Sequence, residues 1–126
     1  MVQIAALFFV LITAVVCAFQ LALIFGAPFG EFTLGGRWRG RLPLLGRVLA
    51  GASLIVLIAF AIVIGSRAGL AFSGLQRVAP VLAWGVVAYC AVGTIANAFT
   101  RSRRERMIWL PVVLSMLISS AVVAAS

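Results

Sequence analysis

The sequence predicts an all-α integral membrane protein, with four transmembrane helices in an antiparallel bundle. Hydrophobic residues make up 65% of the 126 residues and charged residues only 10%, whereas soluble domains have about 45–50% and about 25%. Four uncharged stretches match the roughly 20 residues that cross a bilayer. All ten arginines and both glutamates lie between these stretches, because a charge near the bilayer centre costs about 2.5 kcal/mol or more. We expect a single membrane domain, 1–126.

The four predicted spans follow one another along the chain and are separated by charged loops. They are 4–25, 48–66, 79–99 and 107–126, and the loops between them are 26–47, 67–78 and 100–106. Each span is apolar on every face, which excludes the alternating pattern of a β-barrel strand and leaves helices to satisfy the backbone. We expect the first span to be an uncleaved helix, since a signal peptide has a basic start and an apolar stretch of only about 7–15 residues.

The arginines are distributed unevenly between the two sides of the membrane. In a four-span chain, the first and third loops share one side, and the second loop shares the other side with both termini. Eight arginines fall in the first and third loops, whereas the second loop has only Arg67 and Arg77. By the positive-inside rule, the first and third loops are cytoplasmic. We therefore predict a multi-pass protein whose N and C termini are both outside.

The loop at 26–47 is the longest and combines residue types that oppose regular structure. Its first part, 26–43, has five glycines and two prolines, which disfavour a helix. Phe29 and Phe32 are apolar, and Trp38 lies between two arginines, a composition that suits the lipid headgroup layer. We expect an interfacial anchor that attracts anionic headgroups by about 1 kcal/mol per basic residue. A lid over a cavity on the cytoplasmic side is the alternative interpretation.

Six charged residues of the two cytoplasmic loops form a candidate cytoplasmic-face charge cluster. They are Glu31, Arg37, Arg39, Arg41, Arg101 and Glu105. The two glutamates are the only acidic residues in the chain. Because an arginine can hold a carboxylate through two parallel hydrogen bonds, such pairs can tie the two loops together. A cation site at one of the carboxylates is the alternative.

Both cytoplasmic loops carry short motifs rich in glycine, proline and arginine. They are 26–31 (GAPFGE), Gly35-Gly36, Leu42-Pro43, Arg47 and 102–111 (SRRERMIWLP). With these motifs the chain resembles a family of small four-span proteins of the bacterial inner membrane, a family whose activity is not assigned. The resemblance covers nearly the whole chain. It implies a four-helix topology in the inner (cytoplasmic) membrane, and it implies no activity, substrate or cofactor.

Polar side chains inside the spans form a candidate ligand cavity. They are Gln20, Ser53, Tyr89, Asn97 and Ser115. At a rise of 1.5 Å per residue, all but Tyr89 lie within about 12 Å of the cytoplasmic boundary. They are therefore close enough in height to surround one cavity. The alternative is that these groups hydrogen-bond neighbouring helices together, at an average of about 0.6 kcal/mol per bond.

A repeat with a spacing of four residues marks one face of the third span. It consists of Gly85, Tyr89, Gly93 and Asn97. Residues four apart lie nearly above one another on a helix. Two small residues permit close approach of another helix, so we expect this face to point into the bundle. If the helix runs on into the cytoplasm, the same face continues through Arg101 to Glu105.

The residues that metal and redox sites need are scarce. The chain has no histidine and no Cys-x-x-Cys motif, so no zinc, haem or iron–sulfur cofactor is expected. Cys17 and Cys90 lie deep in apolar spans, away from the basic neighbours that activate a thiol, and we expect small packing residues there. The net charge of +8 follows from membrane topology, so we expect no nucleic-acid partner. No catalytic residue is assigned.

Three classes of function remain compatible with the sequence. We expect a non-enzymatic lipid- or partner-binding membrane protein, whose partners are anionic membrane lipids, a second copy in a homodimer or another membrane protein. The alternative is a small oligomeric transporter or channel, since four helices are too few to enclose a path alone. A second alternative is a lipid-modifying enzyme at the cytoplasmic surface, with Glu31 or Glu105 as acid or base.

Overall fold

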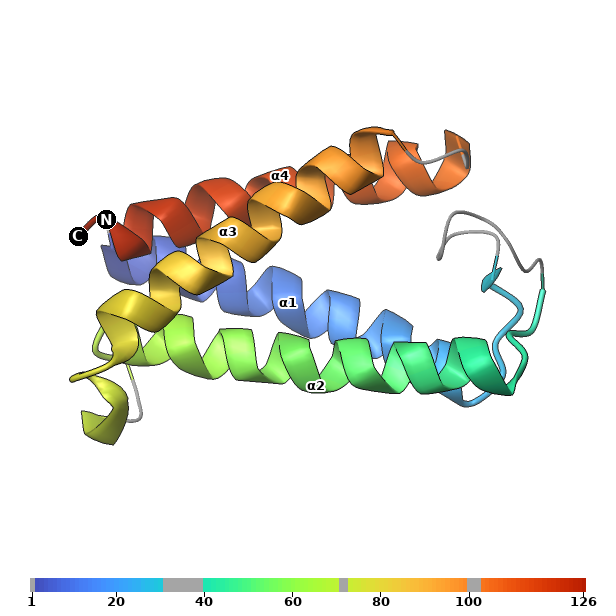
Figure 1. Cartoon of the computed structure of the whole chain (residues 1–126), viewed down its shortest axis with the longest axis horizontal. Helices are drawn as coiled ribbons and strands as arrows, with labels where there is room; N and C mark the ends of the chain where they lie inside the picture. The colour runs from blue at the N-terminus through green and yellow to red at the C-terminus, as the bar shows by residue number, and fades with distance from the viewer. Residues whose placement is uncertain (1, 31–39, 71–72, 100–102) are drawn as a thin grey trace.

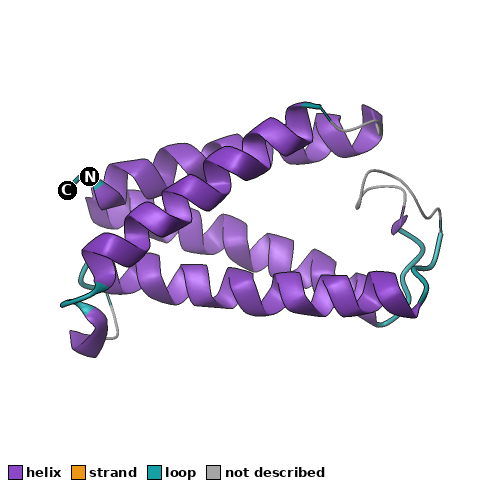
Figure 2. Ribbon diagram, in the orientation of Figure 1, coloured by secondary structure: helices purple, strands orange, loops and turns teal. Residues whose placement is uncertain are grey.

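The computed structural model of the chain describes residues 2–30, 40–70, 73–99 and 103–126. The elements are α1 (Val2–Ile24), α2 (Leu44–Arg67), the short 3-10 helix η3 (Ser73–Leu75), α3 (Ala79–Ala98) and α4 (Arg103–Ala124). Consecutive long helices run in opposite directions, and helix is the only regular structure in these ranges (Figure 1, Figure 2). Each long helix is long and apolar enough to span a membrane. The structure therefore confirms the predicted fold class, an all-α membrane protein with an antiparallel four-helix bundle.

The outward faces of the long helices are apolar. Val15, Ile55, Val81 and Ile118, one from each helix, are between 59% and 77% exposed in the isolated chain. Such a surface is unfavourable in water and suits contact with lipid tails. The exposed faces thus agree with the composition in indicating a multi-pass membrane protein.

α2 and α4 each begin about one turn before the apolar span that the sequence predicts. α2 begins at Leu44 rather than Val48, with Pro43 as its N-cap, and α4 begins at Arg103 rather than Met107. The charged residues mark where the lipid ends, whereas helical hydrogen bonding continues through the first turn outside it. Hydropathy therefore indicates the spans, whereas α2 and α4 start outside them.

α1 ends in a tight turn that depends on Gly26. Its φ of +94° lies in the left-handed region that favours glycine. The N–H of Ala27 donates to the Ala22 carbonyl (2.9 Å), and the N–H of Gly26 donates to the Leu23 carbonyl (3.1 Å), as in a Schellman motif. The chain later folds back onto this end of the helix, since Leu42 is buried in a cluster with Leu23.

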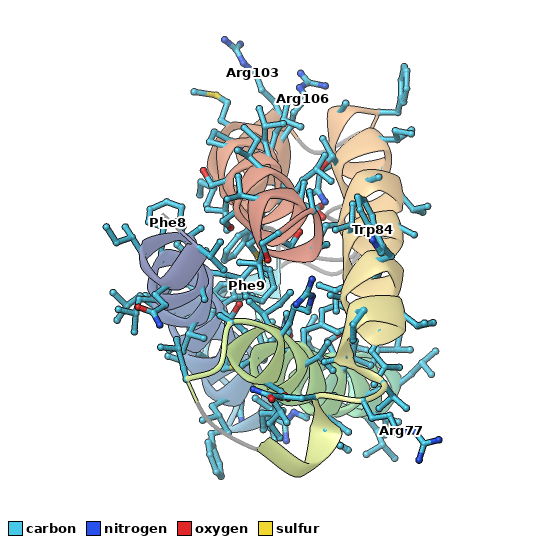
Figure 3. All side chains as sticks on the ribbon, turned by 90° about the vertical axis from the view of Figure 1, so that its left-hand side faces the viewer. Phe8, Phe9, Arg77, Trp84, Arg103 and Arg106 are labelled. Carbon is cyan, nitrogen blue, oxygen red and sulfur yellow. The ribbon has the colours of Figure 1, made fainter. Side chains whose placement is uncertain are left out.

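The four helices share a core at the end of the bundle that holds both chain termini, which we call the closed end (Figure 1). Phe9 of α1, Ile64 of α2, Val86 of α3 and Val123 of α4 are each at most 2% exposed there. Figure 3 views the bundle from this end and shows Phe9 pointing between the helices, whereas its neighbour Phe8 points away from them. The helices are therefore held together chiefly at the closed end.

At the opposite end, which we call the open end, the α1–α2 pair and the α3–α4 pair diverge (Figure 1). The buried cluster there consists of Leu23, Leu42 and Ala50, and it belongs to the α1–α2 half alone. A ring contact joins the two halves in this region: Phe19 of α1 and Trp109 of α4 lie edge to face, with their centroids 4.8 Å apart. This uneven packing positions the candidate site.

Candidate functional site

A partly open cavity of about 220 Å³ lies between the two helix pairs, toward the open end. All four long helices contribute to its lining. The lining residues are Val16 and Gln20 of α1; Ser53, Val56, Leu57 and Phe60 of α2; Tyr89, Cys90, Gly93 and Asn97 of α3; and Glu105, Trp109, Val112, Val113 and Met116 of α4. The cavity thus brings polar side chains of all four long helices to one space, whereas the buried Thr13, Ser66, Ser119 and Ser120 lie outside it.

Four of the five residues of the predicted cavity line this space. Gln20, Ser53, Tyr89 and Asn97 surround it, and they come from three helices. Ser115 does not, because it lines a separate apolar groove between α1 and α4. The prediction considered depth in the membrane but not direction around the helix axis, and Ser115 lies off the face of α4 that borders the cavity.

The hydrogen bonds of the polar side chains in the spans run mostly along single helices. Asn97 Nδ2 donates to the Gly93 carbonyl (2.8 Å), and Ser115 Oγ donates to the Pro111 carbonyl (2.8 Å). Such bonds to the residue four positions earlier satisfy a polar side chain without any neighbouring helix. The alternative role as bonds between helices is therefore not seen for Asn97 or Ser115. One donor of the Asn97 amide is used, and an asparagine amide offers a second donor and an acceptor.

Aromatic rings border the cavity on two sides, and two of these residues were not predicted. Phe60 of α2 and Tyr89 of α3 lie edge to face with their centroids 4.9 Å apart, and Trp109 of α4 contacts Phe19 of α1. Phenylalanine is common in all the spans, so nothing in the sequence distinguishes Phe60. Trp109 could have been found, since it lies four residues after Glu105 and therefore on the same helix face.

Glu105 brings a carboxyl group to the lining of the cavity. It lies in the first turn of α4 and is the one acidic residue in the ranges that the structure describes. The helix dipole favours a carboxylate at this position, which gives Glu105 a structural role whatever the cavity holds. Trp109 lines the cavity one turn later. A carboxylate together with an aromatic ring suits a positively charged amine.

The predicted charge cluster lies mostly outside the described residues. Its members Glu31, Arg37, Arg39 and Arg101 are outside them. Its other two members are in different places, since Glu105 lines the cavity and the Arg41 side chain lies beside Gly26 at the end of α1. The side chains of Arg103 and Arg106 extend from α4 on the side away from the other helices (Figure 3).

The face of α3 that carries the four-residue repeat only partly points into the bundle. A Cβ on Gly93 would lie 3.8 Å from Val113 of α4, whereas a Cβ on Gly85 would meet nothing within 4 Å. Residues four apart are offset by about 40° around the helix, so the row turns away from the bundle along its length. α3 ends at Ala98, with Phe99 as its C-cap, so the condition for this row to continue through Arg101 to Glu105 is not met.

The two cysteines are free thiols in separate environments. Cys90 of α3 lines the cavity, whereas Cys17 of α1 lines an apolar groove between α1 and α2. Within the described ranges, no three side chains of His, Cys, Asp or Glu come together as possible metal ligands.

Comparison of the chain with known protein families, characterised proteins and solved structures finds no match. The resemblance to a family of small bacterial membrane proteins stays a prediction.

Proposed function

We propose that the protein is a non-enzymatic, lipid-binding protein of the bacterial inner membrane, with the open end of the bundle on the cytoplasmic side. The observation that carries the proposal is the cavity, where Gln20, Ser53, Asn97 and Glu105 bring polar groups from all four helices to one space. Polar side chains that line a space within a membrane bundle can hydrogen-bond a polar ligand there, in surroundings where water is scarce. A polar cavity in such a bundle is therefore suited to a polar ligand.

The size and chemistry of the cavity favour the headgroup of an amine-bearing phospholipid. Its volume of about 220 Å³ is below the roughly 300–1,000 Å³ of pockets that enclose drug-sized molecules, so it takes part of a lipid rather than a whole one. Glu105 supplies a carboxylate for an ammonium group, and Trp109 supplies an aromatic face. The amides of Gln20 and Asn97 supply donors for phosphate or ester oxygens.

Native mass spectrometry of the detergent-purified protein tests this proposal. The protein is offered phosphatidylethanolamine and, separately, phosphatidylglycerol, which lacks the amine. We expect Glu105→Gln to weaken retention of phosphatidylethanolamine about tenfold or more, because one charge-assisted hydrogen bond contributes about 1.5–3 kcal/mol. We expect the same change to leave retention of phosphatidylglycerol unaltered.

Two serines provide a matched control for the same experiment. Ser53→Ala removes a hydroxyl that lines the cavity, and Ser115→Ala removes a hydroxyl that lies outside it. We expect only the first change to weaken lipid retention. A wild type that retains no lipid, or equal losses in the two serine variants, would contradict the proposal.

A small oligomeric transporter is a second candidate, favoured by the one-sided position of the cavity. The cavity lies toward the open end, and the closed end is filled by the core around Phe9 and Val123. A site that is accessible from one side of the membrane only corresponds to one state of an alternating-access transporter. Four helices are too few for such a transporter, so a second copy of the chain would complete it. Uptake of a radiolabelled amine into proteoliposomes, lost in Asn97→Ala, would favour transport over simple binding. Vesicles that take up nothing would remove this candidate.

A further inference from the structure

Two guanidinium groups converge at the end of α1, on the glycine that terminates the helix. A Cβ at Gly26 would lie 2.7 Å from Arg41 Nη2 and 3.0 Å from Arg47 Nη2. Both side chains therefore occupy the space that any other residue at position 26 would fill. Like charges this close repel each other unless a negative group lies near them.

The described part of the chain holds no acidic side chain at this place. Arg47 Nε is buried and has no hydrogen-bond partner among the described residues. The one carboxylate side chain in those ranges, Glu105, lines the cavity on α4. A buried guanidinium donor without an acceptor is unfavourable, because it loses its hydration without replacement.

The negative end of the helix dipole explains only part of the arrangement. It attracts a cation to the last turn of α1. However, the carbonyls of Leu21, Ala22 and Leu23 already accept backbone N–H groups of the turn. Each guanidinium has five N–H donors in a planar fork, so two of them offer far more donors than the end of the helix can use.

We propose that Arg41 and Arg47 bind an oxyanion of the phosphate class at the end of α1, and that Gly26 leaves the space for both guanidinium groups. The planar fork of arginine matches the oxygens of a phosphate. The site lies where α1 ends, at the level of the charged loops that border the lipid. The oxyanion is either the phosphodiester of an anionic lipid or a free phosphate. The site shares no residue with the cavity and does not depend on its ligand.

Binding of two probes separates the sources of the oxyanion. Phosphatidylglycerol is offered to the detergent-purified protein in native mass spectrometry, and inorganic phosphate is titrated into lipid-free protein by calorimetry. We expect Arg41→Gln and Arg47→Gln each to weaken binding about fivefold, the effect of about 1 kcal/mol per basic residue. Arg77→Gln is the control, because Arg77 is exposed and points away from the bundle (Figure 3).

Gly26 and Gly69 both have a positive φ, and substituting each of them provides a second test. Gly69 ends α2 with a φ of +77°, in the same type of turn as Gly26. A Cβ there would meet only Gln76 Nε2, at 3.8 Å. Gly26→Ala and Gly69→Ala therefore impose a similar backbone cost, but only Gly26→Ala displaces the two guanidinium groups. We expect binding to fall in Gly26→Ala and to be unchanged in Gly69→Ala.

The binding of the two probes to the wild type and to the arginine variants either supports or overturns the proposal. Binding of phosphatidylglycerol alone supports a lipid phosphate, and binding of inorganic phosphate supports a free oxyanion. A wild type that binds neither probe overturns the proposal, and gain of binding in Glu31→Gln would then identify Glu31 as the internal counter-charge. Binding that persists in the Arg41→Gln/Arg47→Gln double variant also overturns it. Circular dichroism of each variant verifies that the helices are intact.

Discussion

Phe8 and Phe9 are adjacent phenylalanines on α1 with opposite surroundings. Phe9 is 0% exposed and lies in the shared core of the closed end, whereas Phe8 is 47% exposed. In a membrane, lipid tails are as apolar as the core, so truncating Phe9 loses packing rather than hydrophobic transfer. A void of about 100 Å³ at about 24 cal/mol per Å³ gives about 2–3 kcal/mol for Phe9→Ala. Lipid can fill the space left by Phe8→Ala, so we expect less than about 0.5 kcal/mol there.

Reversible unfolding in mixed micelles of dodecylmaltoside and dodecyl sulfate measures this difference. The chain has three tryptophans, whose fluorescence follows the transition. Phe8→Ala controls for the loss of an aromatic side chain at nearly the same depth. Equal changes in the free energy of unfolding for the two variants would refute the reasoning, since they would show that Phe9 does not pack among the helices.

Two further predictions concern helix packing and topology. Gly93→Leu should destabilise the bundle by about 1–3 kcal/mol through overpacking against Val113, whereas Gly85→Leu should change stability by less than about 0.5 kcal/mol because its Cβ meets nothing within 4 Å; the same unfolding assay measures both. In a chain whose own cysteines are replaced by alanine, Arg77→Cys should react with an impermeant maleimide added outside intact cells, and Arg103→Cys only after lysis. The reverse labelling pattern would invert the proposed orientation.

The fold follows from composition because the bilayer imposes few solutions. Runs of apolar residues between arginines predict four helices, and the structure has four that can span a membrane. The helix ends were harder to predict, since α4 continues outward to Arg103. A charged residue is excluded from lipid but not from a helix. The apolar span and the hydrogen-bonded helix therefore have different ends.

The sequence predicts the depth of the site residues in the membrane, but it does not predict the direction in which each residue points around its helix axis. Counting residues from the loops placed Gln20, Ser53 and Asn97 at similar heights, and the structure brings them to one cavity. Ser115 has a similar height but lies on another side of α4, because each residue turns by about 100° around the helix axis. The approach of Arg47 to Gly26 could not be predicted, since it depends on how the chain folds back after α1.

The uneven packing of the bundle also has a mechanical consequence. The shared core of Phe9, Ile64, Val86 and Val123 holds the four helices together at the closed end. The α1–α2 and α3–α4 hairpins extend from this core toward the open end. A small rotation of one hairpin about this core changes the distance between the two hairpins most at the open end. We therefore expect the width of the cavity, and with it the occupancy of its ligand, to differ between thin and thick bilayers.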